Sequence, residues 1–275
     1  MITFEAVSKI YPDGTTAVRN FSLDVPEGKI VAMVGSSGSG KTTLLRMVNR
    51  MVEPSAGAVR INGEDVRTQD PVALRRSIGY VLQHAGLLPH HSVADNVATV
   101  PVLNGVPKRK ARQDALEVMA RVGLGPELAK RYPAQLSGGQ QQRVGVARAL
   151  AANPEILLMD EPFGAVDPIV RRELQDELLR LQAELGKTIL FVTHDIDEAL
   201  RLGDHIVLLQ AGGQVAQQGT PTELLTAPAN DFVRSFIGAD APQRTLHITE
   251  VGGVAVAVDG MGRTVGRVVS DGVAP

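Results

Sequence analysis

A short glycine-rich segment between an apolar run and a helical pattern constrains the fold of this chain most. Residues 35–42 read GSSGSGKT, which fits the phosphate-loop pattern G-x-x-x-x-G-K-[ST], and they directly follow the apolar run 30–34. Leu44, Leu45 and Val48 then recur at the spacing of one helix face. A flexible Gly/Ser linker would not lie directly between a buried strand and a helix. The segment therefore predicts an α/β domain that binds a nucleoside triphosphate between a buried strand and a helix.

The residue types of this loop suit phosphate binding. Glycines at positions 35, 38 and 40 let the backbone point successive N–H groups inward, and the following helix adds its positive N-terminal end. Lys41 is placed to reach the β- and γ-phosphates, and the Thr42 hydroxyl is placed to bind Mg²⁺. The residues of the loop expected to contact ATP are Gly35, Ser36, Gly38, Ser39, Gly40, Lys41, Thr42 and Thr43.

Apolar runs alternate with helical patterns along most of the chain. Further strands are expected at 2–7, 17–25, 59–61, 78–82, 156–159, 189–193 and 206–210. Residues 84–152 are mostly helical instead, and their clearest helices, 92–99, 109–122 and 138–152, are separated by Pro101, Pro107, Pro126 and Pro133. A helix is also expected at 168–185. This order predicts a largely parallel sheet with helices on its faces and a helical insertion.

Composition and charge exclude several other classes of function. The net charge of −2 gives no positive field to attract nucleic acid, and the basic cluster at 108–112 favours a solvated helix start. The chain contains no cysteine, which rules out disulfides and thiolate chemistry. No apolar run approaches the roughly 20 residues that span a bilayer, and the first residues lack a signal-peptide pattern. If the protein works at a membrane, we expect another chain to hold it there.

Two carboxylates end the apolar run 156–159. Ligands of open α/β sheets bind at the carboxyl ends of strands, so Asp160 is a candidate Mg²⁺ ligand, directly or through water. Glu161 is the candidate general base for an attacking water. An acidic pair that merely caps the turn at 162–164 would be an equal alternative in isolation. The phosphate loop upstream makes the catalytic interpretation the stronger one.

Three further segments place polar residues at strand ends or at a helix start. Residues 137–140 read SGGQ and precede a strong helical run, which makes them a second candidate anion-binding end or an ordinary helix cap. Gln83 ends the strand expected at 78–82, and His194 ends the strand expected at 189–193. A solvated strand-end amide and a helix-capping histidine are the alternatives for these two residues.

The order of these motifs resembles that in the ATPase subunits of ATP-binding-cassette (ABC) transporters. The resemblance rests, in chain order, on Tyr11, Lys41, Gln83, Ser137, Asp160, Asp167 and His194. It implies that Gln83 senses Mg²⁺ or water, and that His194 contacts the γ-phosphate and orients the water with Glu161. It also implies that Thr42, Gln83 and Asp160 bind the metal. Tyr11 would stack on adenine, with the filling of a turn as an equal alternative.

The same resemblance implies an assembly. In that family the signature segment, here Ser137, Gly138, Gly139 and Gln140, binds the nucleotide held by a second subunit, so that two chains form a head-to-tail homodimer. Asp167 matches the D-loop that communicates across this dimer, and Val166 stands where the family more often has leucine. The fold implied is an ABC ATPase core with an antiparallel β subdomain, a helical subdomain at about 84–152 and a short C-terminal β appendage.

Within the family, the chain is most similar to importers of quaternary-amine osmoprotectants such as glycine betaine, choline, carnitine and proline. The similarity lies in the stretches 11–15, 45–50, 78–83, 95–101 and 160–168. Importers of polar amino acids share several of these stretches, and a cytosolic ABC ATPase without a permease is a further alternative. The chain carries one cassette and no membrane span, which favours a separate permease.

This assignment implies partners, a location and a domain division. We expect a membrane permease, a substrate-binding protein that acts through it, and attachment to the cytoplasmic face of the inner membrane. Residues 83–101 are the candidate docking surface, although core burial of Leu87 and Leu88 would explain the same apolar stretch. Residues 1–240 are expected to form the ATPase domain and 241–275 a small β tail. Residues 254–269 resemble a hairpin of a CBS domain.

Overall fold

The computed structural model describes residues 1–164, 166–239, 241 and 244–268, in two compact units, 1–221 and 222–275. Ala165, in the expected D-loop, and the end of the tail from residue 269 lie outside the described residues. The second unit begins before residue 240 and includes two helices as well as the expected β tail. The division at residue 240 therefore stays a proposal.

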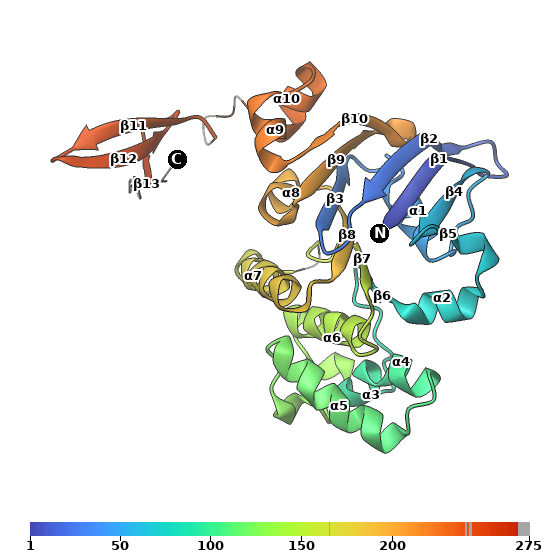
Figure 1. The fold of residues 1–275 in the computed structure, drawn as a ribbon. Helices are drawn as coiled ribbons and strands as arrows, with labels where there is room; N and C mark the ends of the chain where they lie inside the picture. Colours follow the sequence, from blue (N-terminus) through green and yellow to red (C-terminus); the bar gives the residue numbers. More distant parts are fainter. Residues whose placement is uncertain (165, 240, 242–243, 269–275) are drawn as a thin grey trace. The chain divides into compact units, whose positions relative to one another are not determined.

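The first unit contains an antiparallel sheet with the strand order β2-β1-β4-β5 (Figure 1). Its strands are β1 (Ile2–Ile10), β2 (Thr16–Val25), β4 (Ala56–Ile61) and β5 (Glu64–Asp65). Alternating apolar residues of β1 and β2 share the buried face, where the rings of Phe4 and Phe21 meet edge to face at 5.4 Å. The expected antiparallel subdomain is confirmed.

A second sheet, with the order β10-β9-β3-β8-β7-β6, carries the site. Its strands are β3 (Ile30–Gly35), β6 (Ile78–Val81), β7 (Ile156–Asp160), β8 (Thr188–Thr193), β9 (His205–Gln210) and β10 (Gln214–Gly219). All neighbours are parallel except β10, which pairs antiparallel with β9 at the edge. Strands β3, β7 and β8 are buried throughout, because both faces of a parallel sheet are covered.

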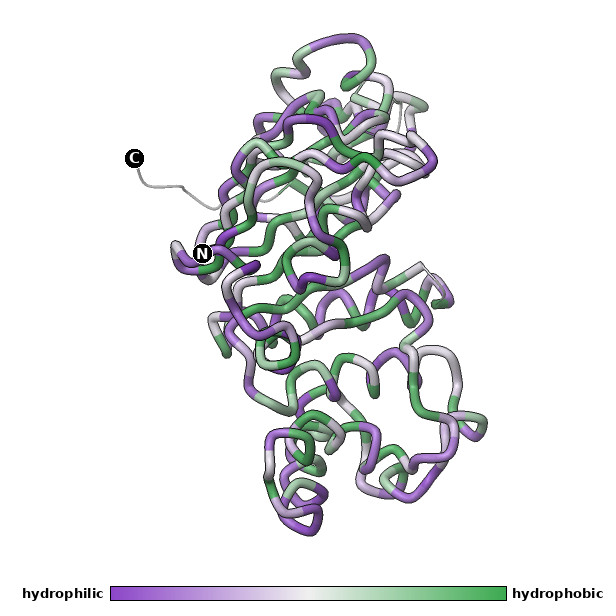
Figure 2. The backbone as a smooth tube through the Cα atoms, turned by 90° about the vertical axis from the view of Figure 1, so that its right-hand side faces the viewer, coloured by the Kyte–Doolittle hydropathy of each residue, from purple (hydrophilic) through white to green (hydrophobic). Residues whose placement is uncertain are grey.

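Helices cover the second sheet and form the insertion between β6 and β7. They are α1 (Lys41–Val48), α2 (Pro71–Ser77), α3 (Val93–Val97), α4 (Thr99–Leu103), α5 (Lys108–Arg121), α6 (Gly138–Leu150), α7 (Pro168–Leu185) and α8 (Ile196–Leu202). Leu44, Leu45, Met47 and Val48 of α1 lie in the same buried core as Phe4 of the first sheet, so α1 packs between the two sheets. In Figure 2 the lowest helices, which include α5, mix green and purple turns, as helices with one buried face do.

The helix expected at 92–99 is present as α3, which is shorter, and a second short helix that was not expected, α4, follows it directly. The sequence pattern predicts that Pro101 separates two helices. In the structure Pro101 instead lies at the third position of α4. A proline is tolerated in the first turn of a helix, where its missing N–H has no intrahelical partner. None of the helices among the described residues combines the length and the apolar character needed to cross a membrane.

An ion pair between α3 and α5 stabilises the helical insertion. Both guanidinium contacts from Arg112 to the Asp95 carboxylate are 2.6 Å long, and Ser92 also hydrogen-bonds to it. These contacts, the hydrogen bond from Arg112 foremost, lower the pKa of Asp95 to about 2. Because the pKa is depressed on folding, the pair contributes stability at neutral pH and loses it as the pH falls through about 2.

We expect Asp95→Asn to lower the free energy of unfolding by about 1–2 kcal/mol at pH 7, after allowance for the partial exposure of the pair. Urea unfolding at pH values from 7 down to 3 measures this. The difference between the variant and the wild type should shrink below the unfolded pKa of 3.8. Asp114→Asn, which removes an exposed carboxylate paired with Lys110, is the control and should change little. A difference for Asp95→Asn that is unchanged at pH 3 would contradict this account.

In its described part, the second unit holds two helices and a three-stranded antiparallel sheet. The helices are α9 (Pro221–Thr226) and α10 (Asp231–Ile237), and the strands are β11 (Leu246–Val251), β12 (Val254–Asp259) and β13 (Thr264–Arg267) in the order β11-β12-β13. Asp259 is the buried carboxylate of this sheet, and it accepts bonds from the Met261 and Arg263 backbone N–H groups. The β character of the tail agrees with the sequence pattern, and the resemblance to a CBS hairpin stays a prediction.

Candidate nucleotide-binding site

The glycine loop joins β3 to α1 in a conformation that depends on its glycines. Gly38 and Gly40 have φ angles of +79° and +88°, in the left-handed region that glycine adopts without strain. A side chain at Gly35 would collide with the Leu209 carbonyl oxygen and the Ser39 hydroxyl. The backbone therefore curls tightly in front of the N-terminus of α1, which is the geometry expected for a loop that binds phosphate.

The Lys41 ammonium lies inside this loop. Its Nζ donates hydrogen bonds to the Gly35 and Ser36 carbonyl oxygens at 2.7 and 2.8 Å, and the residue is 5% exposed. Burial lowers the pKa of Lys41 from its ordinary value. The loop thus holds a desolvated cation at the place where the sequence predicts phosphate binding, and an anion there would gain strongly from it.

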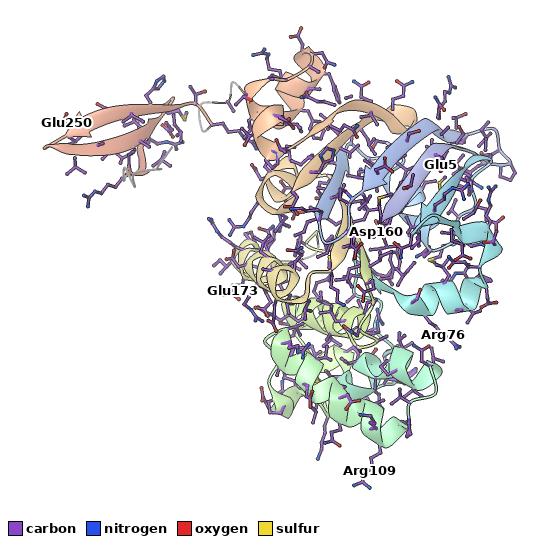
Figure 3. The ribbon with its side chains drawn as sticks, viewed as in Figure 1. Glu5, Arg76, Arg109, Asp160, Glu173 and Glu250 are labelled. Atoms are coloured by element: carbon purple, nitrogen blue, oxygen red, sulfur yellow. The ribbon has the colours of Figure 1, made fainter. Side chains whose placement is uncertain are left out.

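Thr42 and Asp160 meet beside the loop. The Thr42 hydroxyl donates to Asp160 Oδ1 at 2.9 Å, so a hydroxyl from α1 and a carboxylate from β7 lie together. Hard oxygen ligands of this kind suit Mg²⁺, which commonly keeps most of its waters. Among the described residues, no cluster of three or more His, Cys, Asp and Glu could hold a metal. Thr42 and Asp160 fit the expected metal site, and Figure 3 shows Asp160 in the interior of the first unit.

Two further residues contact the Asp160 carboxylate and were missed as site residues. The Tyr80 hydroxyl donates to Asp160 Oδ2 at 3.3 Å, and Arg46 Nη2 lies 3.5 Å from the same oxygen. Arg46 lies one helical turn after Thr42, so its position on the same face of α1 was available from the sequence. No sequence signal placed Tyr80 there, because its contact depends on the pairing of β6 with β7.

Gln83, Glu161 and His194 meet at the ends of three neighbouring parallel strands. Gln83 Nε2 donates to Glu161 Oε2 at 3.0 Å, and His194 Nδ1 lies 3.1 Å from the same oxygen. Glu161 has a φ of +44°, a strained conformation for a residue with a side chain, and its N–H donates to the Val192 carbonyl oxygen. Residues expected from separate segments to act together are thus brought to one point.

Tyr11 lies beside the phosphate loop. Its hydroxyl is 3.3 Å from the Thr43 hydroxyl, and the Lys9 ammonium lies over its ring, 5.3 Å from the ring centre. Asp13 accepts a hydrogen bond from the Thr15 N–H and shapes the turn that follows. A tyrosine that stacks on adenine must lie beside the loop, as Tyr11 does. The same geometry also fits the alternative, in which Tyr11 fills the turn.

The segment 137–140 is built as a helix N-terminus. The Gln140 N–H donates to Ser137 Oγ at 3.2 Å and the Ser137 N–H donates to Gln140 Oε1 at 3.0 Å, which is a capping box. A helix start here fits both sequence interpretations, the anion-binding end and the ordinary helix cap. Gly138, the first residue of α6, is exposed. In Figure 1 helix α6 lies among the helices of the insertion, apart from α1.

Asp167 is likewise a capping residue. Its side chain accepts a hydrogen bond from the Ile169 N–H at 3.0 Å at the start of α7. Neither Asp167 nor the segment 137–140 has a recorded hydrogen bond or ion pair with the loop 35–43 among the described residues. The expected site residues therefore form one cluster at the loop and the adjoining strand ends, and a second group at the neighbouring starts of α6 and α7, where Gly139 packs against Val170.

Comparisons with known proteins find extensive sequence similarity. The sequence model of the ABC transporter family matches residues 18–164. The glycine betaine/carnitine/choline transport ATP-binding protein OpuCA of Bacillus subtilis (strain 168) is 52% identical over 240 residues, 87% of this chain and 63% of that protein. The glycine betaine uptake system ATP-binding protein YehX of Escherichia coli (strain K12) is 53% identical over 238 residues, 86% of this chain and 77% of that protein.

A solved structure extends the comparison to the fold. The dimeric structure of a post-hydrolysis state of the ATP-binding cassette MJ0796, bound to ADP and Pi, has a TM-score of 0.72 and 35% sequence identity. The match covers 80% of this chain and 99% of that chain. This chain spans less than two thirds of the length of OpuCA.

Proposed function

This chain belongs to the ABC transporter family, and we propose that it is the ATP-hydrolysing subunit of an importer for quaternary-amine osmoprotectants. The observation that carries the proposal is the meeting of Gln83, Glu161 and His194 at three strand ends, next to a phosphate loop. The names of OpuCA and YehX, which refer to glycine betaine, support the substrate class. The likeness to a cassette bound to ADP and Pi supports the nucleotide.

Glu161 is proposed as the proton acceptor for the water that attacks the γ-phosphate. The hydrogen bond from Gln83 and the contact with His194 fix one carboxylate oxygen, which orients the group before water arrives. The backbone of Glu161 is strained, with a φ of +44°, directly after the end of β7. Lys41 supplies positive charge where negative charge is spread over the phosphate oxygens.

Thr42 and Asp160 are proposed to hold Mg²⁺, with the amide oxygen of Gln83 as a further ligand. Bound Mg²⁺ would neutralise charge on the phosphate oxygens. Tyr80 and Arg46 already hold the other oxygen of Asp160, so the carboxylate keeps its orientation without the metal. Tyr11 is proposed to stack on the adenine ring beside the loop.

A homodimer is proposed because each chain carries two incomplete parts of a site. Ser137, Gly138, Gly139 and Gln140 form an exposed helix N-terminus that has no recorded bond to the phosphate loop of the same chain among the described residues. The positive end of α6 suits the phosphates of a nucleotide held by a second chain. The related cassette MJ0796 is dimeric, which supports the same arrangement here. Asp167 would then lie near the contact between the chains.

The segment 83–101 is the proposed docking surface for a permease. Asn96 is fully buried, and its side chain bonds both the N–H and the carbonyl of Leu88 and the carbonyls of His91 and Ser92. These bonds fix the loop after Gln83 while Leu88 stays 40% exposed. Leu87 is partly buried, so core burial explains only half of the apolar pair. Docking to a permease would place the protein at the cytoplasmic face of the membrane.

Reconstitution tests the proposed function. The chain is purified with the multi-spanning membrane protein that accompanies it, placed in vesicles with the substrate-binding protein, and ATP hydrolysis is measured. We expect stimulation by glycine betaine, choline or carnitine and none by histidine or glutamine. Stimulation by histidine or glutamine would instead identify an importer of polar amino acids. Full hydrolysis by the chain alone, without any membrane partner, would identify a non-transport ATPase.

A further inference from the structure

One arginine joins two segments that the proposed mechanism uses separately. Arg171 lies one turn into α7, after the capping residue Asp167. Its Nη2 donates to the Val166 carbonyl oxygen at 3.4 Å, in the segment that precedes α7. Its Nη1 lies 3.6 Å from Asp195 Oδ2 and 3.9 Å from Glu198 Oε1. A single guanidinium thus spans from the start of α7 to the junction between β8 and α8.

The junction that Arg171 reaches is the one that carries His194. Thr193 and Asp195 flank the histidine, and the Asp195 N–H donates to the Thr193 hydroxyl at 3.0 Å. That hydroxyl donates in turn to Glu198 Oε2 at 2.6 Å. Asp195 also caps α8 through the Asp197 N–H at 2.9 Å. Both neighbours of His194 are therefore fixed in one hydrogen-bonded network, which Arg171 joins through its ion pairs with Asp195 and Glu198.

The burial of Glu198 distinguishes its contact with Arg171 from a surface ion pair. Glu198 is 4% exposed, and burial raises the pKa of its carboxyl. A buried carboxylate needs a nearby cation, and the ion pairs recorded for Glu198 come from Arg171 alone among the described residues. Arg171 is itself partly buried, with 30% of its side chain exposed. The contact is therefore screened less than an exposed pair would be.

We propose that Arg171 is a positioning residue that couples the segment Val166–Asp167 to His194, and through His194 to Glu161. A displacement of Val166 and Asp167, such as a second subunit would produce by contact, moves the Arg171 guanidinium with them. The network at 193–198 then shifts His194, whose ring lies 3.1 Å from Glu161. Arg171 acts through these neighbours, and we assign it no contact with the nucleotide. This inference rests on the proposed role of Glu161 and His194 in hydrolysis.

Arg171→Ala, Arg171→Lys and Arg172→Ala, each made in the full chain, test the coupling. We expect Arg171→Ala to lower kcat for ATP hydrolysis by about tenfold with KM for ATP unchanged. Misplacement of a catalytic group lowers the rate of the chemical step more than it weakens the binding of ATP. Arg171→Lys should recover part of kcat, because lysine keeps the charge beside Glu198. Arg172 is the exposed neighbour on the same helix, and Arg172→Ala should match the wild type.

A direct observation of His194 separates coupling from general damage. The imidazole resonance of His194, assigned by its loss in His194→Gln, is followed by NMR, and the thermal midpoint of each variant is measured. The inference predicts that the resonance moves in Arg171→Ala and stays in place in Arg172→Ala. An unmoved resonance in Arg171→Ala, or an equal kcat for Arg171→Ala and Arg172→Ala, would overturn the coupling. Wild-type hydrolysis by both Glu161→Gln and His194→Gln would instead overturn the proposed function on which it rests.

Discussion

Replacing Glu161 by glutamine should leave ATP binding intact and lower the rate of hydrolysis about 10³-fold, the range observed when a general base is lost. Glutamine has the same shape, so the strained backbone at this position and the contact with Gln83 can persist. What is lost is the group that accepts the proton of the attacking water. The loop, Lys41 and the Thr42–Asp160 pair do not depend on that charge for their contacts.

Binding and hydrolysis are measured separately in this experiment. Fluorescent ATP analogues report binding, and phosphate release reports turnover. Lys41→Ala is the matched comparison, because removal of the ammonium from the loop should weaken nucleotide binding itself. Turnover at the wild-type rate in Glu161→Gln would remove Glu161 from the mechanism. Loss of binding in the same variant would show that the carboxylate serves the nucleotide and not the water.

The sequence predicts the buried part of the second sheet well. Strands β3, β7 and β8 are continuous apolar runs, and burial on both faces demands such runs, so their positions could be read directly. The edge strand β10 (Gln214–Gly219) was missed, because its residues are polar and partly exposed and carry no period. Helix α2 was also missed, although Asp70 and Pro71 are a recognisable start signal for a helix.

In the candidate site, too, the sequence pattern predicts some residues, whereas residues whose contacts depend on packing could not be predicted. Residues at strand ends, such as Gln83, Glu161 and His194, were predictable, because the carboxyl ends of parallel strands meet at one edge. Tyr80 was not, since its contact with Asp160 depends on the register of β6 against β7. The strained backbone of Glu161 could not be predicted either, because it depends on how β7 ends against Val192.

Two inactive variants of this chain should restore activity to one another when mixed. Lys41→Ala removes the cation of the phosphate loop, and Gly138→Asp places a negative charge at the exposed N-terminus of α6. An aspartate at the start of a helix is favourable for the helix itself, so Gly138→Asp should fold. It should nevertheless repel the phosphates of a nucleotide held by the partner chain. Each variant alone is expected to hydrolyse ATP at the background rate.

In a mixed dimer one of the two composite sites combines the intact loop of the Gly138→Asp chain with the intact helix start of the Lys41→Ala chain. Random pairing of equal amounts then gives at most about a quarter of the wild-type activity, from one intact site in half of the dimers. Phosphate release is measured for each chain and for the mixture. Mixing Lys41→Ala with a chain that carries both substitutions is the control, because no composite site is then intact. A mixture that stays at background would contradict the assignment of residues 137–140 to the site of the partner chain.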